Sequence, residues 1–245
     1  MNIADGAGVV VDGEVLVQCE GAARTYGAGP AAVVAVHGAT CQVRSGDRIA
    51  ITGPSGSGKS TLVHLMAALE EPTAGRVTRP GLAAGRIAGQ IGVVFQGPSL
   101  IPALDVAENT ALPLVLAGVP GGEAEIRALD ALALVAADDL ARKLPEELSG
   151  GQAQRVAIAR VLALRPRLIL ADEPTGQLDG VTGQHVVDVL LSVADEIGSA
   201  LVVTTHDPTV ALRLREQWEM HEGRLQPVAG PSQRTGVTAH RKDTP

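Results

Sequence analysis

A glycine-rich loop between a predicted strand and a predicted helix constrains the fold of this chain more than any other feature. The apolar run Arg48–Thr52 leads into the loop Gly53–Ser60, and a helical pattern follows over Thr61–Leu69. This arrangement matches the phosphate-binding loop G-x-x-x-x-G-K-[ST] in the strand–loop–helix context that it requires. Its glycines let backbone N–H groups converge on phosphate oxygens, and the helix N-terminus adds its dipole. The alternative is a glycine- and serine-rich turn that matches the pattern by accident.

Lysine is rare in this chain, and one of its lysines falls in this loop. Only Lys59, Lys143 and Lys242 are lysines among 20 basic residues. A compact ammonium fits against a backbone loop better than the planar fork of arginine does. Lys59 is therefore expected to reach the β- and γ-phosphates of a nucleotide, and Ser60 to bind Mg²⁺. The expected nucleotide-binding residues of this loop are Gly53, Pro54, Ser55, Gly56, Ser57, Gly58, Lys59, Ser60 and Thr61.

Two acidic residues, Asp172 and Glu173, end the apolar run Leu168–Ala171. A carboxylate at the end of a buried parallel strand is well placed to hold a nucleotide-bound Mg²⁺. Successive strand residues point in opposite directions, so the two acids are expected to do different work. Asp172 is assigned to the metal, directly or through water, and Glu173 to the attacking water. The alternative for such a pair is a helix cap or a solvated turn.

Three further polar features lie where loops are expected. Leu148–Gln152 (Leu-Ser-Gly-Gly-Gln) is a second glycine-rich helix start, and it is either an anion site or a helix whose N-cap is Ser149. Gln96 and His206 each follow an apolar strand, where ligands bind in open α/β sheets. The alternative for each of these two residues is a purely structural role.

The alternation of strand and helix patterns predicts an α/β domain with a mostly parallel sheet. Short apolar runs predict five strands, and the last three runs are continuous, as expected for strands covered on both faces. The stripe formed by Val186, Leu190, Val193 and Ile197 predicts an amphipathic helix. Residues 98–165 show helical patterns and no strand, which predicts an inserted helical subdomain. The predicted strands are Val15–Cys19, Arg48–Thr52, Ile91–Phe95, Leu168–Ala171 and Leu201–Thr204.

The sequence also predicts the limits of the domain and the absence of a membrane-spanning segment. The domain is expected to span residues 14–226, with flexible tails at 1–13 and 227–245, because the second of these lacks apolar periodicity. The N-terminus lacks a secretory signal, and no segment reaches the ~18 apolar residues of a membrane helix. The protein is therefore expected to be soluble and to meet a membrane only through a partner.

Composition argues against a nucleic-acid partner. The formal charge is −7 and aromatic residues make up 1% of the chain, so it lacks both a basic excess and stacking platforms. Cys19 and Cys41 form neither a metal motif nor a disulfide framework, and reduced cytosolic thiols are expected.

In order and approximate spacing, these motifs resemble those of the ATP-binding cassette (ABC) ATPase family. The resemblance runs from about Val15 to Leu225, and Leu-Ser-Gly-Gly-Gln is its most diagnostic element. It implies a P-loop NTPase (RecA-like) sheet with an N-terminal antiparallel β subdomain and the inserted helical subdomain. The motifs that carry it are Gly53–Ser60, Gln96, Leu148–Gln152, Leu168–Glu173, Leu178-Asp179 and His206.

The family resemblance also implies a shared active site. Two copies pack head to tail, and ATP lies between the phosphate loop of one and Ser149, Gly150, Gly151 and Gln152 of the other. Further roles follow from the same resemblance. Tyr26 stacks on adenine, Gln96 binds the metal and links the γ-phosphate site to a membrane subunit, and His206 holds the γ-phosphate and the attacking water.

Within the family, Ser99–Leu104, Glu108-Asn109 and Leu112–Leu114 resemble the branch that serves lipoprotein release, macrolide export and related FtsX-like permeases. That branch implies a separate FtsX-like permease as partner and a cytoplasmic location on the inner face of the cell membrane. This sequence departs from the usual pattern at Gln177, at Ala153, and between Leu69 and Gln96, where the segment is short and is expected to lack a small helix.

The expected function is that of an ATP-hydrolysing subunit that powers a membrane permease. One alternative is a regulatory ABC ATPase that signals to a membrane partner without net transport. A second is a cassette ATPase of nucleic-acid metabolism, but such proteins carry a long coiled coil or two cassettes, and this chain has neither. A third, a P-loop kinase, gives no reason for the second glycine-rich loop.

Overall fold

The computed structural model describes residues 13–83 and 89–228. Its strands form two sheets, one of three strands in the order β2-β1-β4 and one of six in the order β5-β6-β7-β3-β8-β9. The strands are β1 (Val15–Tyr26), β2 (Val33–Arg44), β3 (Arg48–Thr52), β4 (Ala74–Thr78), β5 (Ile91–Val94), β6 (Leu168–Asp172), β7 (Ala200–Thr205), β8 (Glu216–His221) and β9 (Arg224–Val228). The α-helices are α1 (Lys59–Met66), α2 (Val106–Leu116), α3 (Gly121–Leu134), α4 (Gly150–Leu162), α5 (Gly180–Glu196) and α6 (Pro208–Ala211).

The six-stranded sheet is parallel except at one edge. β5, β6, β7, β3 and β8 pair in parallel, and β9 pairs with β8 antiparallel. Every residue of β6 and β7 is buried, as the continuous apolar runs of the sequence predict. The mostly parallel sheet is therefore confirmed, and the four strands predicted within it are correct to within one residue at each end.

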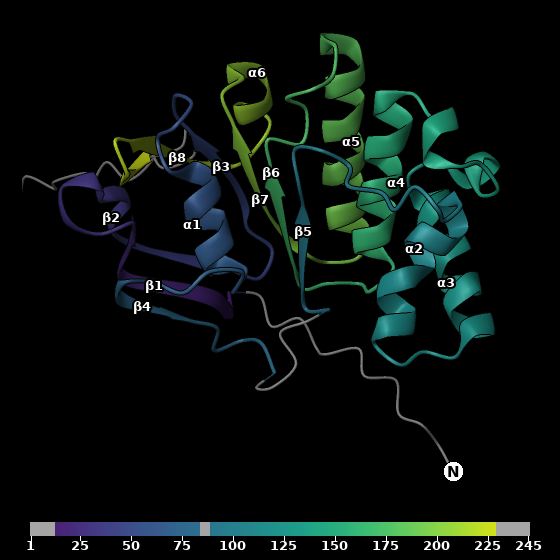
Figure 1. The fold of residues 1–245 in the computed structure, drawn as a ribbon, viewed down its shortest axis with the longest axis horizontal. Coiled ribbons are helices and arrows are strands. Elements are labelled where there is room, and N and C mark those ends of the chain that lie inside the picture. The colour runs from purple at the N-terminus through teal and green to yellow at the C-terminus, as the bar shows by residue number, and fades with distance from the viewer. Residues whose placement is uncertain (1–12, 84–88, 229–245) are drawn as a thin grey trace, which may run out of the picture.

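The sheet separates two apolar cores because successive residues of a strand face opposite sides. In β6, Leu168 and Leu170 pack with α1 and the three-stranded sheet, whereas Ile169 and Ala171 pack with α4, α5 and the helices beyond. Figure 1 shows α1 on one side of the strands and α4 and α5 on the other. The same parity points Asp172 toward α1.

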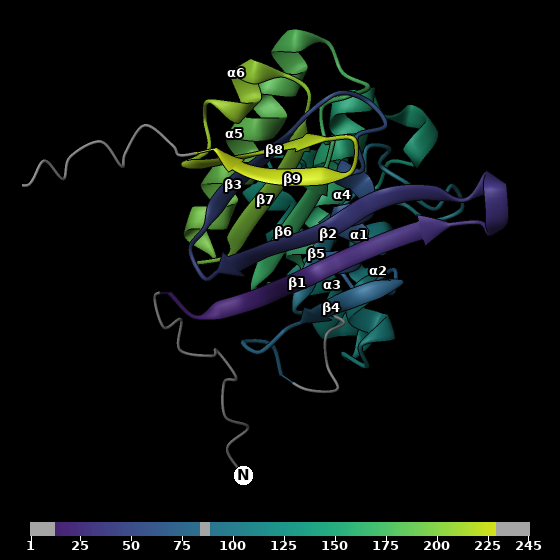
Figure 2. The same cartoon turned by 90° about the vertical axis from the view of Figure 1, so that its left-hand side faces the viewer.

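The three-stranded antiparallel sheet covers α1 from outside. Figure 2 shows β1, β2 and β4 side by side, with the β8–β9 hairpin next to β2. A hydrogen bond from His37 N to Gly223 O, 2.8 Å long, joins β2 to the turn of that hairpin. This confirms the antiparallel subdomain that the family resemblance implied.

The sequence patterns missed β2, β4, β8 and β9 and recognised only the first five residues of β1. β1 and β2 have register shifts along their pairing, and much of β2 is exposed, so neither shows a clean apolar alternation. The tail predicted from residue 227 was placed too early, because β9 continues pairing to Val228. Residues 1–12 and 229–245, where the tails were also predicted, lie outside the described residues.

Residues 98–165 hold α2, α3, α4 and two short 3₁₀ turns without a strand, as predicted. Two helices differ in their bounds from the sequence patterns. α1 ends at Met66 rather than at Leu69, and Ala68, just after its end, adopts a φ of +59°. α4 begins at Gly150 rather than at Ala153. Between α1 and β5 the described residues form no helix, and residues 84–88 of that segment lie outside the description. No described helix is both long enough and apolar enough to cross a membrane.

Candidate active site

The predicted phosphate-binding loop and two of the predicted catalytic residues, Glu173 and His206, lie where β3, β6 and β7 end, whereas the third, Gln96, follows β5. β3 leads into the loop Gly53–Gly58, β6 ends at Asp172, and His206 follows β7. β7 pairs with both β3 and β6 in parallel, so the three carboxyl ends meet at one edge of the sheet.

The phosphate loop is held tightly between two other strands. Gly53 has a φ of +145°, and a Cβ there would lie 2.1 Å from Met220 O of β8. Gly58 has a φ of +97°, and a Cβ there would lie 2.1 Å from Ala35 O of β2. Only glycine fits these two positions. Gly58 is also the N-cap of α1, and because it has no side chain, it leaves the first N–H groups of the helix free for an anion.

Lys59 is the first residue of α1, and its side chain lies back along the loop. It is 4% exposed, and its Nζ donates to Gly53 O and Pro54 O at 3.0 Å each. Nζ also lies 3.4 Å from Glu173 Oε1. The loop carbonyls and Glu173 therefore place the ammonium between the phosphate loop and the second acid of β6.

Asp172 is tied to two hydroxyl groups on the α1 side of the sheet. Ser60 Oγ donates to Asp172 Oδ1 at 3.0 Å, and Thr204 Oγ1 donates to the same oxygen at 2.6 Å. A carboxylate and a hydroxyl oxygen side by side are the ligand types that Mg²⁺ prefers. Ser60 and Asp172, the predicted metal ligands, are therefore adjacent and chemically suited to that ion.

Glu173 is directed away from Asp172 and toward the other catalytic candidates. Its φ of +45° is rare for a residue with a side chain, and such strained backbone concentrates at functional sites. Its amide N donates to Thr204 Oγ1 at 2.9 Å, and its Oε2 lies 3.3 Å from His206 Nδ1. The two acids thus have separate surroundings, as the strand parity predicted.

Thr204 is a site residue that the sequence patterns missed. It is fully buried on β7, and its one hydroxyl donates to Asp172 and accepts from the amide of Glu173. The signal in the sequence was a pair of hydroxyl residues, Thr204 and Thr205, at the end of an otherwise aliphatic strand.

The second glycine-rich loop does not meet the first within one chain. Ser149 is the N-cap of α4: its Oγ accepts from Gln152 N at 3.3 Å, and its amide N donates to Gln152 Oε1 at 2.9 Å. The helix-cap interpretation is therefore correct for the local structure. Among the described residues, no hydrogen bond or ion pair links Ser149–Gln152 to Gly53–Ser60.

Tyr26 lies at the end of β1 and forms a cluster with two charged residues. Its hydroxyl donates to Glu70 Oε1 at 2.7 Å, and the Arg24 guanidinium lies 4.8 Å from its ring centroid. Arg24 also pairs with Glu70 at 2.6 Å. The guanidinium covers one ring face, and no described contact joins Tyr26 to Lys59, so its stacking on adenine stays a prediction.

Gln96 lies at a small hollow on the helical side of the sheet. The hollow has a volume of about 130 Å³ and is lined by Gln96, Pro98, Gly150, Gln154, Gln177 and Leu178. Gln96 is exposed and makes no described contact with Ser60 or Asp172, so its role as a metal ligand also stays a prediction. The hollow brings Gln96 close to Gly150 of the second glycine-rich loop and to Gln177.

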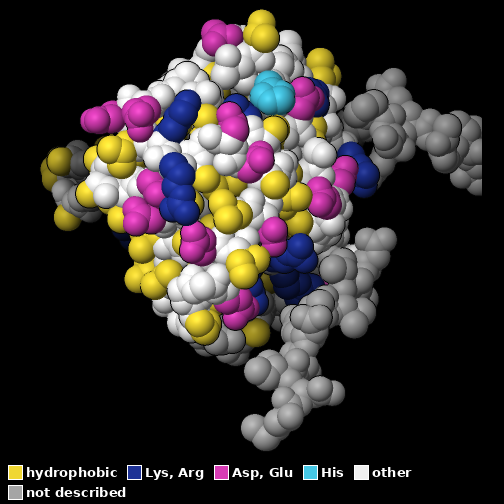
Figure 3. Space-filling view, turned by 90° about the vertical axis from the view of Figure 1, so that its right-hand side faces the viewer, with side chains coloured by type: hydrophobic (Ala, Val, Ile, Leu, Met, Phe, Trp, Pro, Cys, Tyr) yellow, Lys and Arg dark blue, Asp and Glu magenta, His cyan; other side chains and the backbone are white. Residues whose placement is uncertain are grey.

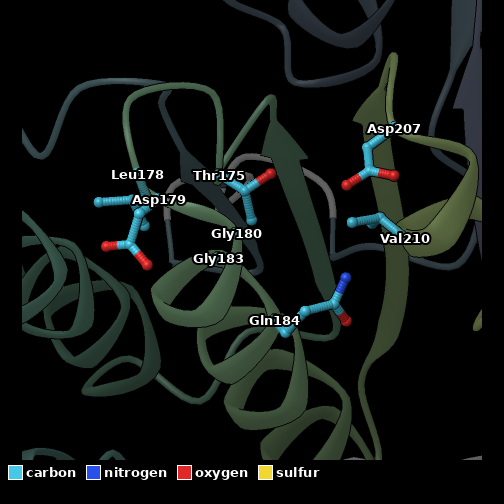
Figure 4. A pocket seen from close by; sticks show the side chains of 8 residues that line it. All are labelled: Thr175, Leu178, Asp179, Gly180, Gly183, Gln184, Asp207 and Val210. Carbon is cyan, nitrogen blue, oxygen red and sulfur yellow. The ribbon is translucent and has the colours of Figure 1, made fainter.

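A second hollow, of about 60 Å³, separates the start of α5 from the loop after His206 (Figure 4). Asp179 caps α5, and Asp207 accepts from Thr209 N and Oγ1 at 2.8 Å each. Hydrogen bonds from Thr182 to Asp179, and from Thr209 to Asp207, hold the pKa of each carboxyl below its usual value. Gln184 Nε2 donates to Thr209 Oγ1 at 2.8 Å and so ties α5 to the His206 loop.

The chain belongs to the ABC transporter family, which it matches over residues 36–176. It is an ABC ATPase, the ATP-binding subunit that energises a transport complex. The P-loop fold and the function that the sequence predicted are thereby confirmed.

Among its relatives is the lipoprotein-releasing system ATP-binding protein LolD of Shewanella sp. (strain MR-4), which is 38% identical over 90% of this chain and 99% of that protein. An uncharacterized ABC transporter ATP-binding protein of Mycobacterium tuberculosis (strain ATCC 25618 / H37Rv) is 43% identical over 82% of this chain and 84% of its own length. A dimeric structure of the cassette MJ0796 bound to ADP and Pi, in a post-hydrolysis state, superposes with a TM-score of 0.75 and 35% identity, covering 87% of this chain and 99% of that one.

Replacing Thr204 with valine is expected to slow ATP hydrolysis more than it weakens ATP binding. Valine keeps the shape of the side chain but removes the hydroxyl that positions both acids. Losing a hydrogen bond to a charged group costs about 1.5–3 kcal/mol, which corresponds to a fall in kcat of roughly 10- to 100-fold. Phosphate release measures kcat, and titration with a fluorescent nucleotide measures affinity.

Thr204→Ser is the matched control because it retains the hydroxyl and is expected to recover most of the rate. A wild-type kcat for Thr204→Val in a folded protein would show that the hydroxyl does not position the acids.

Proposed function

We propose that this ABC ATPase works as a head-to-tail dimer that drives a separate FtsX-like permease from the cytoplasmic face of the cell membrane. The observation that carries the proposal is the cluster of Lys59, Ser60, Asp172, Glu173 and His206 at one sheet edge, together with a second glycine-rich helix start that lies apart from it. The cluster provides the groups that hydrolyse ATP. The separate loop would complete the ATP site of a second copy of the chain.

Within one chain, Glu173 is the general base. Its carboxylate lies between Lys59 and His206, and its backbone is held by Thr204. A carboxylate fixed in this way can accept the proton of an attacking water. Lys59 and His206 would stabilise the charge on the γ-phosphate, and Ser60 and Asp172 would hold Mg²⁺, which supplies neutralisation of phosphate charge when bound. Gln96 would be a further ligand of the metal, and Tyr26 would stack on adenine.

Glu173→Gln tests the assignment of the base. Glutamine keeps the size of the side chain but cannot accept the proton, so kcat is expected to fall by roughly 10²–10⁴-fold, the usual effect of losing a general base. ATP binding is expected to persist, and the ATP-bound variant is expected to accumulate as a dimer with twice the mass in light scattering. Hydrolysis at the wild-type rate would move the base to another residue.

The second loop is the argument for a shared site. Gly53–Ser60 already provides a lysine, a hydroxyl and a helix N-terminus for phosphate, so Ser149–Gln152 is redundant if each chain serves only its own ATP. The relative MJ0796 has been observed as a dimer with ADP and Pi. Donors that approach the γ-phosphate from a partner would stabilise transition-state charge and exclude water.

Mixing two inactive variants tests this sharing. Ser149→Arg blocks the second loop, and Lys59→Ala removes the phosphate-binding ammonium, so each is expected to be inactive alone. A mixed dimer contains one site that combines wild-type Lys59 from the first variant with wild-type Ser149 from the second. Partial ATPase activity on mixing, measured by phosphate release, is therefore expected.

A tethered dimer with only one intact site is the control, since it shows whether a single site suffices. If that control is active and the mixed dimers form without activity, the site is not shared.

The permease is proposed to dock beside the segment Leu100–Leu116, which follows Gln96. This segment is braced from inside: Asn109 is fully buried and its amide binds Ile101 N, Ile101 O and Leu104 O at 2.8–3.1 Å. Its exposed apolar residues include Ile101 and Leu116, at 39% and 78% exposure. Figure 3 shows the side of the molecule that carries α2 and α3, where apolar side chains are interspersed with charged ones.

Ala103→Trp tests this surface. Ala103 is exposed in the loop before α2, so a bulky side chain there is expected to block docking while leaving ATP binding intact. Asp105 is a poorer probe because it caps α2 and lies 3.6 Å from Arg142. Co-purification with a co-expressed FtsX-like permease is the measurement.

Ala74→Trp, the same change at an exposed position of β4, is the control and is expected to leave the complex intact. Full recovery of the complex with Ala103→Trp would place the dock elsewhere.

A further inference from the structure

The only two cysteines of the chain face each other across neighbouring strands. Cys19 on β1 and Cys41 on β2 are partners in the antiparallel register, and both are free thiols. Directly opposed residues of such a pair have Cα atoms about 4.5–5.5 Å apart, and a disulfide requires about 4.4–6.8 Å. The sheet therefore already holds the two cysteines at a spacing that a disulfide can bridge.

The two thiols differ in their access to solvent. Cys19 is 1% exposed and belongs to the core between β1 and α1, whereas Cys41 is only partly buried. A small reagent can therefore reach Cys41 more readily than Cys19.

The surroundings favour a thiolate in this pair. The hydrogen bond with Cys41 lowers the pKa of the Cys19 thiol, burial opposes this, and the positive charge of Arg79 lowers it further. The same hydrogen bond, together with burial, raises the pKa of Cys41, so the thiolate of the pair lies on Cys19. Arg79 is itself fixed by hydrogen bonds to Leu65 O and Met66 O, at 2.5 and 2.9 Å, at the end of α1. A thiolate is the nucleophile in disulfide exchange, so a cysteine beside an arginine is more reactive than a lone buried one.

We propose that Cys19 and Cys41 form a redox-responsive pair that closes to an intramolecular disulfide by exchange with a low-molecular-weight disulfide of the glutathione type. Cys41, the more accessible sulfur, passes its proton to the Cys19 thiolate, attacks one sulfur of the small disulfide, forms a mixed disulfide and releases one thiolate. The Cys19 thiolate then attacks the Cys41 sulfur, forms the Cys19–Cys41 bond and releases the second. The two protons lost by the cysteines go to the released thiolates, so two cysteines are oxidised and one small disulfide is reduced to two thiols.

The disulfide joins β1 covalently to β2, and β2 lies against the phosphate loop. Ala35 of β2 lies against Gly58. A covalent link between β1 and β2 restricts their separation in the unfolded chain and so stabilises the folded protein. In reducing conditions the pair stays open, as is usual for transient disulfides of cytosolic proteins.

The test exposes the purified full-length protein to oxidised glutathione, quenches it with acid, unfolds it and treats it with N-ethylmaleimide. Intact-mass measurement is expected to show a protein that has lost two hydrogens and carries no maleimide, and dithiothreitol is expected to restore two reactive thiols. The melting temperature of the oxidised protein is expected to rise above that of the reduced protein.

Cys41→Ser and Cys19→Ala are the matched variants, and neither is expected to show the rise in melting temperature. Two maleimide-reactive thiols in the treated wild type, a mixed disulfide that persists at Cys41, or a disulfide-linked dimer on a non-reducing gel would each overturn the proposal. Because the readouts are mass and melting temperature, they are independent of ATP hydrolysis and of the permease.

Discussion

The hydroxyl of Thr204 connects the two acidic residues of the candidate active site. It donates to Asp172 and accepts from the amide of Glu173, so one side chain on β7 fixes both acids at the end of β6. Asp172 in turn meets Ser60 of α1, and Glu173 meets Lys59 and His206. The Thr204 hydroxyl is thus a contact that the two acids share, in addition to the pairing of β6 with β7 and the bonds that each acid makes by itself.

α4 connects the remaining parts of the molecule that the proposed mechanism uses. Its N-terminus carries Ser149, and along its length Gln154 donates to Phe95 O at 3.1 Å, while Arg160 donates to Ser99 O at 2.9 Å and to Pro98 O at 3.1 Å. The segment on both sides of Gln96 is thus attached to the same helix as the second glycine-rich loop. α4 therefore links the segment proposed as the permease dock to the loop proposed to meet the ATP of a partner.

The three-stranded sheet restricts the conformation of the phosphate loop and contributes none of the proposed catalytic residues. Its Ala35 carbonyl and the Met220 carbonyl of β8 approach the phosphate loop so closely that only glycine fits at positions 53 and 58. The loop is one continuous segment, but two segments far from it in the sequence restrict its conformation. The same sheet brings Cys19 and Cys41 into register, which places a thiol pair beside Arg79 and the end of α1.

The sequence by itself determined the family and the central parallel strands, and it supplied the main candidates for site residues. Buried parallel strands are continuous apolar runs, and the phosphate loop and the Leu-Ser-Gly-Gly-Gln motif need particular residues at fixed spacings, so each is visible locally. β2, β4, β8 and β9, the role of Thr204 and the pairing of Cys19 with Cys41 were decided only by the tertiary structure. Half-exposed antiparallel strands with bulges lack a regular pattern, and contacts between distant segments leave no local signal, because the register of two strands is set by how the whole sheet packs on α1.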